Sequence, residues 1–318
     1  MIAKLLLALT ATGAGLAWYS NRLARQAEAR VPADGRFVEI DGARLHVVDL
    51  RPAVPDPASP PIVLVHGLCG QVRNFTYALA TRLAERHRVV VLDRPGSGYS
   101  TPAPGPFPGL VAQARLVARL IEALELEESP LLVGHSLGGA ISLALALERP
   151  TCVRGLALIA PLTQPVVEAP RALAGLRVPA SLRWLIARTL AVPLTRWSGD
   201  KGLALAFSPE PVPADFPVRG GADLALRPGS AFAASSDVCS VNAEMPALAV
   251  RYGELALPVA VLYGRDDRLL DHRLHGVRFA AQAPGVQLEL IDGGHMLPVT
   301  RAAEVANWIE RTLAQPGA

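Results

Sequence analysis

Short apolar runs of strand length alternate with amphipathic stretches along most of this chain. Continuous apolar runs are typical of strands that are buried on both faces, as in a parallel sheet. Strands that alternate with helices predict an α/β fold with a mostly parallel central sheet and right-handed crossovers. The runs lie at residues 62–67, 88–93, 130–134, 153–160, 258–264 and 286–295.

The stretches between these runs carry the apolar spacing of helices that face a core. An earlier segment, residues 36–50, has two short strand patterns around Asp41-Gly42, and this arrangement predicts a hairpin. The expected helices cover residues 75–86, 108–126 and 137–148, and a last helix ends near residue 314.

The periodicity changes between residues 161 and 255, where short helical pieces are interrupted by many prolines and glycines. We interpret this block as a helical cap inserted after the strand that follows the helix at 137–148. The α/β core then comprises residues 31–160 and 256–318. The aromatic residues of the cap either line a hydrophobic substrate site or build a core of the cap itself. They include Trp184, Trp197, Phe207, Phe216 and Phe232.

The first 30 residues differ from the rest, because an apolar run from Leu5 to Tyr19 is followed by three arginines. A membrane span needs about 20 apolar residues. Residues 1–3 could complete it if Lys4 extends toward the interface, and Trp18 and Tyr19 suit an interfacial position. We expect a retained N-terminal anchor in the membrane. The alternatives are a cleaved signal sequence of a secreted or periplasmic protein, with cleavage at 27–29, and a peripheral helix.

Composition and charge exclude several classes of function. The net charge is +3, but lysine occurs only twice and the arginines are scattered, so no stripe for nucleic acid is present. The three cysteines form no C-x-x-C pair, and no H-x-x-x-H motif occurs. We therefore expect no metal and no cofactor.

The stretch "LLVGHSLGGAIS" places Ser136 between an apolar strand and a helical pattern. A G-x-S-x-G sequence in this context is typical of a sharp turn that exposes the serine at the end of a strand. Glycines flank the serine because the turn leaves no room for side chains. The helix that follows directs its first N–H groups, including that of Leu137, at the site.

Three other motifs fall at strand ends, where reactive residues of a parallel sheet collect. "HGLCG" at residues 66–70 can curl so that the N–H of Leu68 points into the site, and with Leu137 it would complete an oxyanion hole. "YGRDDR" offers an aspartate after the next-to-last strand, and "DGGH" offers His295 after the last. The order serine, aspartate, histidine is that of a hydrolase triad. We expect His66 and His135 to brace their loops, and His272 and His275 to lie on the surface.

These motifs, together with "DRPGSGYS", resemble those of the α/β-hydrolase superfamily, in its serine esterase and lipase-like branch with a cap. The resemblance selects Asp267 rather than Asp266 as the acid. The other acid position of the family lies after the strand at 153–160, where this chain has no carboxylate. The resemblance implies a catalytic triad of Ser136, His295 and Asp267 and an acyl-enzyme intermediate.

The implied substrate is a small-molecule carboxylic ester with a hydrophobic part, and the anchor makes lipid-like esters plausible. The same triad also suits a C–C hydrolase or a cofactor-free perhydrolase, also called a haloperoxidase. A protein from another class, a non-catalytic binding protein on the same fold, is the third alternative.

Overall fold

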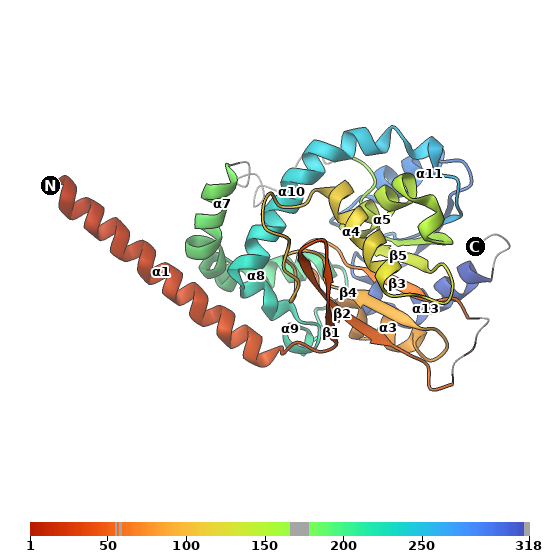
Figure 1. The fold of residues 1–318 in the computed structure, drawn as a ribbon, viewed down its shortest axis with the longest axis horizontal. Helices are drawn as coiled ribbons and strands as arrows, with labels where there is room; N and C mark the ends of the chain where they lie inside the picture. Colours follow the sequence, from red (N-terminus) through yellow and green to blue (C-terminus); the bar gives the residue numbers. More distant parts are fainter. Residues whose placement is uncertain (55, 57–58, 166–177, 315–318) are drawn as a thin grey trace.

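The computed structural model describes the chain except for residues 55, 57–58, 166–177 and 315–318. Its centre is an eight-stranded sheet in the order β1-β2-β4-β3-β5-β6-β7-β8, in which all pairs except β1·β2 and β2·β4 are parallel (Figure 1). The mostly parallel α/β sheet that the apolar runs predicted is therefore confirmed. The strands are β1 (Arg36–Ile40), β2 (Ala43–Leu50), β3 (Ile62–Val65), β4 (Val89–Leu92), β5 (Leu131–His135), β6 (Gly155–Ile159), β7 (Val259–Gly264) and β8 (Gln287–Ile291).

Helices cover both faces of the sheet, and this explains why the central strands are apolar at every position. Alternate side chains of β3 enter different cores, with Val63 and Val65 on one face and Ile62 and Leu64 on the other. The first core includes α4 (Leu110–Ala123) and α5 (Leu137–Glu148). The second includes α2 (Arg73–Thr76), α3 (Leu79–Leu83) and α13 (Ala302–Leu313). Two short helices, α11 (Arg278–Gln282) and α12 (Leu297–Thr300), complete the C-terminal part.

The single helix expected at residues 75–86 is wrong, because the structure divides this stretch into α2 and α3. The backbone leaves the helical region at Ala78, with φ −154°. The preceding Tyr77 turns toward the segment between β6 and β7, where its hydroxyl donates to Asp215 at 2.7 Å and its ring packs against Phe216. A tertiary contact thus overrides the local helical pattern.

The segment between β6 and β7, which we call the cap, is described at residues 161–165 and 178–255, and its helices lie within residues 180–254. Its two longest helices, α8 and α10, run for 16 and 22 residues, so the expectation of short pieces is wrong for them. α10 begins at Pro228, where no intrahelical N–H is needed. α8 continues without a break from the π-helical turn that ends at Ala191, so Pro193 is the second residue after that turn. The cap contains α7 (Ala180–Ile186), the π-helical turn η2 (Ala187–Ala191), α8 (Val192–Phe207), α9 (Phe216–Arg219), η3 (Ala222–Leu226) and α10 (Pro228–Ala249).

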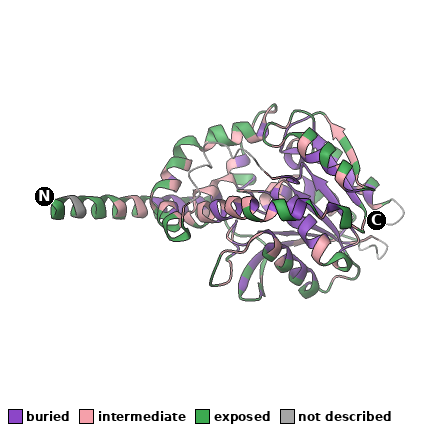
Figure 2. Cartoon of the chain, turned by 90° about the horizontal axis from the view of Figure 1, so that it is seen from above, coloured by how far each residue is buried: buried purple, intermediate pink, exposed green. Residues whose placement is uncertain are grey.

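The N-terminal helix α1 (Ile2–Arg30) has two different halves. The N-terminal half projects away from the body and is exposed (Figures 1 and 2). The other half packs on the cap, where Leu23, Ala27 and Val31 are buried. α1 is long and apolar enough to cross a membrane, a property that signal sequences share.

Candidate active site

Ser136 lies at the turn between β5 and α5, in a backbone conformation with φ +55°. A positive φ is strained for a serine, and such strain is held at a turn only by tight surroundings. A side chain at Gly134 would approach the Ser142 hydroxyl to 2.6 Å, and one at Gly138 would collide with the carbonyl oxygen of Val65. The flanking glycines are therefore required by close packing, and the turn presents Ser136 at the carboxyl end of β5.

Asp267 and His295 meet at the same edge of the sheet, from the loops that follow β7 and β8. Nδ1 of His295 donates to Oδ2 of Asp267 at 2.7 Å. The other carboxylate oxygen accepts the N–H groups of Leu269 at 2.8 Å and Leu270 at 3.0 Å. Burial by itself would raise the pKa of Asp267, but the positive charge and hydrogen bond of His295, with the two N–H groups, lower it overall. Asp267 is thus an ionised acceptor that orients the imidazole.

His135 ties the loop of His295 to the end of β5, one residue before Ser136. Its Nε2 donates to the carbonyl oxygen of His295 at 3.0 Å, and the two rings lie 4.9 Å apart between centroids. Burial, followed by the proximity of His295, lowers the pKa of His135 to about 3. His135 is therefore a neutral brace, one residue before Ser136, that holds the loop of His295.

The loop after β3 presses directly on the serine. A Cβ at Gly67 would lie 2.8 Å from Cβ of Ser136 and 3.3 Å from its hydroxyl oxygen. Nδ1 of His66 donates to the carbonyl oxygen of Gly67 at 2.8 Å. A trans peptide points its carbonyl and the next N–H in opposite directions. The N–H of Leu68 is therefore directed away from Nδ1 of His66, which binds the carbonyl oxygen of Gly67. The backbone thus leaves the N–H of Leu68 available on the other side of the loop.

Arg94 holds the same loop, although "DRPGSGYS" enters the prediction from sequence only as a motif of the family resemblance, which gives this arginine no role. Its guanidinium donates to the carbonyl oxygens of His66 and Gly67, each at 3.0 Å. Its backbone N–H donates to Nε2 of His66 at 3.0 Å. The side chain is fully buried and pairs with Asp237 of α10 at 2.9 Å. The sequence carries one signal for this role. An arginine directly after the apolar strand "VVVLD" needs a partner for its charge when the end of the strand is buried.

The cap also touches the site loops at two other places. The carbonyl oxygen of Gly220 accepts hydrogen bonds from Gln71 at 2.6 Å and Asn74 at 3.1 Å, just after the Gly67 loop. The N–H of Gly294, next to His295, donates to Glu210 at 3.2 Å. Polar contacts from the cap thus reach the loops on both sides of Ser136.

The aromatic residues of the cap divide into two groups. Phe207 and Phe216 are buried, with ring centroids 4.7 Å apart, and they pack with Met296, the residue after His295. Phe232 packs against Phe107 of the core in an edge-to-face pair. Trp184 and Trp197 are exposed, at 49% and 83%. The first group joins the cap to the core, while the two tryptophans face solvent in this structure.

The expectation that His275 lies on the surface is wrong. Its side chain is buried, and its Nδ1 accepts the N–H groups of Thr163 and Gln164, each at 3.2 Å. Burial lowers the pKa of His275 to about 4, so it is a neutral acceptor that ties the start of the cap to the core. Within the described residues, no group of three His, Cys, Asp or Glu side chains is placed to hold a metal ion.

This fold and this arrangement of loops define the class of protein. The family model described as the alpha/beta hydrolase fold matches residues 60–302, so the chain belongs to the α/β-hydrolase family. The family and the names of related proteins support hydrolase activity.

Two related proteins show how far the similarity extends. A protein from Variovorax paradoxus that carries the name carbamate hydrolase RutD is 28% identical over 247 residues, which are 76% of this chain and 87% of that protein. The dihydrolipoyllysine-residue acetyltransferase component of the acetoin cleaving system from Cupriavidus necator is 32% identical over 126 residues. That match covers 40% of this chain and 32% of the component, so the chain spans only about a third of that protein.

Solved structures share the fold at low identity. The enol-lactonase from Burkholderia xenovorans is 18% identical with a TM-score of 0.70, and the match covers 88% of this chain and 100% of that one. A membrane phospholipase A described as a bacterial virulence factor is 22% identical with a TM-score of 0.61. That match covers 98% of both chains, so it extends into α1.

Proposed function

We propose that this protein is a serine hydrolase that cleaves carboxylic esters through Ser136, His295 and Asp267. The observation that carries the proposal is the Asp267–His295 hydrogen bond, whose loop is tied through His135 to the turn that holds Ser136 with strained backbone at the N-terminus of α5. An imidazole oriented by a buried carboxylate is the base that a serine hydroxyl needs, because the hydroxyl does not ionise unaided near neutral pH.

The proposed reaction has two stages. In the first, the oxygen of Ser136 attacks the ester carbonyl while His295 takes the hydroxyl proton. The N–H groups of Leu68 and Leu137 bind the oxyanion, and collapse of the tetrahedral intermediate expels the alcohol, which receives the proton from His295. In the second, water attacks the acyl-enzyme, His295 takes a proton from that water and returns it to Ser136, and the carboxylic acid leaves.

We propose a substrate with a hydrophobic acyl or alcohol part, bound between the core and the cap domain (161–255). The support is that Met296, the residue after His295, packs with Phe207 and Phe216 of the cap, so the cap lies against the loop of His295; these buried rings join the cap to the core and do not themselves form a substrate surface. Similar structures include an esterase from Thermogutta terrifontis and the membrane phospholipase A, and these names favour esters over other acyl compounds. Lipid-like esters are the natural choice if α1 holds the protein at a membrane.

We further propose that α1 is retained as a membrane anchor. A signal sequence is removed and has no need to pack on the mature protein. Here Leu23, Ala27 and Val31 are buried, and Arg30 forms an ion pair with Asp223 of the cap. Cleavage at residues 27–29 would remove part of this packing.

The test is hydrolysis of p-nitrophenyl esters of increasing acyl length, together with labelling by a fluorophosphonate probe. Wild type should cleave the esters and take up the probe on Ser136, and Ser136→Ala should do neither. Ser142→Ala is the matched control, because it removes a buried hydroxyl from the same helix but not the nucleophile. Activity at the wild-type level in Ser136→Ala would overturn the mechanism, and a protein without any adduct would be a binding protein on this fold. Labelling of Ser136 without ester cleavage would point to the C–C hydrolase or perhydrolase alternative.

A further inference from the structure

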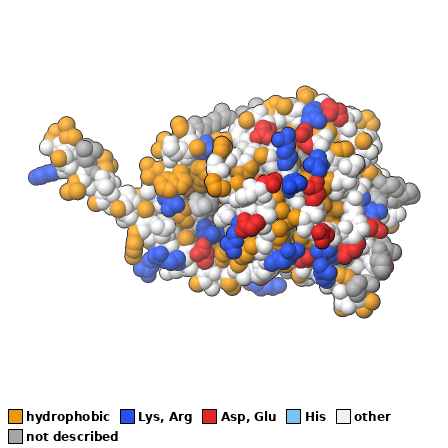
Figure 3. All heavy atoms as spheres, in the orientation of Figure 1, with side chains coloured by type: hydrophobic (Ala, Val, Ile, Leu, Met, Phe, Trp, Pro, Cys, Tyr) orange, Lys and Arg blue, Asp and Glu red, His pale blue; other side chains and the backbone are white. Residues whose placement is uncertain are grey.

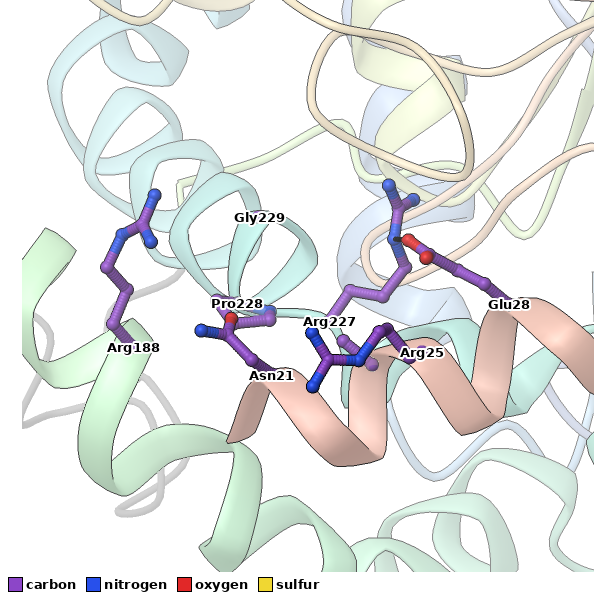
Figure 4. Close-up of a pocket in the computed structure, with 8 residues that line it drawn as sticks. Asn21, Arg25, Glu28, Arg188, Arg227, Pro228 and Gly229 are labelled. Carbon is purple, nitrogen blue, oxygen red and sulfur yellow. Dashed lines mark ion pairs between the residues drawn. The ribbon is translucent and has the colours of Figure 1, made fainter. Parts of the chain in front are cut away.

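A shallow basic pocket of about 270 Å³ lies between α1 and the cap, and Ser136 is not among its lining residues (Figure 4). Both elements contribute side chains to it, and Figure 4 shows Arg25 of α1 between Arg188 and Arg227 of the cap. Its lining consists of Asn21, Ala24, Arg25 and Glu28 from α1 and of Arg188, Arg227, Pro228 and Gly229 from the cap.

The charges in this lining do not balance. Glu28 is the one carboxylate among the lining residues, and it pairs with Arg227 at 2.7 Å. Arg188 lies over the ring of Trp184, 4.2 Å from its centroid. Within the described part of the chain, neither Arg25 nor Arg188 has a carboxylate within 4.0 Å. Among the described residues, two positive charges of the pocket thus have no carboxylate partner, and an anion would complement them.

The pocket lies where the apolar part of α1 ends. Trp18 and Tyr19, which precede the first lining residue Asn21 by three and two positions, are exposed, as expected for side chains at a membrane interface. The hydroxyl of Ser20 donates to the carbonyl oxygen of Thr189 at 3.4 Å, so η2 lies beside α1 at this level.

The cap is apolar on its surface next to this level. Figure 3 shows hydrophobic side chains gathered on the part of the cap that lies nearest to α1. The residues of α7, η2 and α8 that are about half exposed include Leu182, Trp184, Leu185, Leu190 and Leu194. If α1 is inserted in a membrane, the pocket lies at the depth of the lipid headgroups, with apolar surface on both sides for acyl chains.

We propose that this pocket binds a phosphate group, and that the group is the phosphodiester of an anionic phospholipid. Arginine binds phosphate oxygens through parallel N–H bonds, and the pocket is lined by Arg25 from α1 and by Arg188 from the cap. The bound lipid is not the substrate, because none of the lining residues belongs to the proposed triad. The choice of a lipid rather than free phosphate rests on the proposed membrane placement of α1. The proposal that the pocket binds a phosphate group does not depend on that placement.

The experiment uses the full chain in micelles of a non-ionic detergent, titrated with ether-linked phosphatidylglycerol and followed by calorimetry. Ether lipids contain no ester, so cleavage by Ser136 cannot contribute. We expect saturable binding that weakens at least about tenfold in Arg25→Gln and in Arg188→Gln, since each removes a charge-assisted contact. Glu28→Gln should strengthen binding, because it removes the competing carboxylate. Arg82→Gln, an exposed arginine of α3 in the core, is the matched control and should bind like wild type.

Two further ligands separate the possible sources of the anion. Ether-linked phosphatidylcholine, whose headgroup is neutral overall, should bind at least about tenfold more weakly than phosphatidylglycerol, and so should inorganic phosphate. Equal affinity for the two lipids, or wild-type affinity in both arginine variants, would overturn the proposal. Equal affinity for inorganic phosphate would overturn the assignment to a lipid.

Cleavage of p-nitrophenyl butyrate is measured in parallel, and the arginine variants should retain it, which also shows that they are folded. Absence of lipid binding in wild type, with its esterase activity intact, would count against the pocket alone. Lipid binding without esterase activity in wild type would count against the proposed reaction alone.

Discussion

The guanidinium of Arg94 donates to the carboxylate of Asp237 at 2.9 Å, across 143 positions of the chain, with both side chains buried. The same guanidinium holds the carbonyl oxygens of His66 and Gly67. The loop that presses on Ser136 and the longest helix of the cap therefore share one buried cation. A substitution at Asp237 should therefore change both the stability of the protein and the geometry of the active-site loop.

Asp237→Ala should lower the free energy of unfolding by about 3–5 kcal/mol, because it leaves the buried charge of Arg94 without its partner. It should also reduce kcat for a soluble aryl ester, since Arg94 would no longer hold the Gly67 loop in place. Urea unfolding and steady-state kinetics measure the two effects.

The control for this prediction is Glu289→Ala, which removes one member of the exposed pair with Arg311. An exposed pair contributes about 0–1 kcal/mol, so this variant should unfold almost like wild type. Equal stability losses in the two variants would contradict the role assigned to burial.

Asp267→Asn should reduce kcat by about 10³- to 10⁴-fold, because an amide at this position stabilises the wrong tautomer of His295. Asp266→Asn is a close control, since its side chain is exposed and the residue is one position away. It should retain activity close to wild type. A larger loss in Asp266→Asn than in Asp267→Asn would reverse the assignment of the acid.

Gly67→Ala should reduce kcat by about 100-fold while the protein remains folded, because displacing the nucleophile by about 1 Å is enough for such a loss. The new methyl group would meet Cβ of Ser136 at 2.8 Å, and one of them has to move. At Gly253 a methyl group has its nearest neighbour at 4.0 Å, so Gly253→Ala should remain active. Kinetics with the shortest active p-nitrophenyl ester check both variants, and full activity in Gly67→Ala would show that the loop is mobile.

His275 predicts a specific dependence of stability on pH. Its pKa is about 4 in the folded protein and about 6.5 in an unfolded chain, so the unfolded chain takes up more protons between these values. Its contribution to stability is complete above about pH 6.5 and decreases as the pH falls toward 4, by up to about 1.4 kcal/mol per pH unit. In His275→Asn, whose amide oxygen can accept the same N–H groups, urea unfolding between pH 4.5 and 6 should show a shallower slope. An unchanged slope would mean that other groups cause the acid sensitivity.

Washing of membranes with carbonate tests the anchor. The full-length chain should remain in the pellet, and a variant that lacks residues 2–19 should move to the supernatant. This variant keeps the buried residues Leu23, Ala27 and Val31, so it should still cleave a soluble aryl ester. Release of the full-length chain by carbonate would exclude a spanning α1.

The sequence predicts the sheet well, because each strand and turn depends on residues that are close together along the chain. The hairpin around Asp41-Gly42 forms where it was predicted, since both residues adopt the positive φ that its turn requires. The glycines that flank Ser136 likewise predict its sharp turn. Fully apolar runs predict strands covered on both faces, and the structure confirms this for β3, β4 and β5.

Tertiary structure alone decided the features that depend on contacts between distant parts of the chain. The break between α2 and α3 follows from the contact of Tyr77 with the cap, and the burial of His275 follows from its bonds to the start of the cap. The pairing of Arg94 with Asp237 and the pocket between α1 and the cap need segments that lie more than 100 positions apart. Periodicity and turn chemistry encode the local backbone, whereas partners for buried charges depend on how the crossovers and the cap pack. The sequence by itself therefore determined the sheet and the position of Ser136 at the end of β5. The packing of the cap decided which buried charges, Arg94 and Asp237, hold the loop beside Ser136.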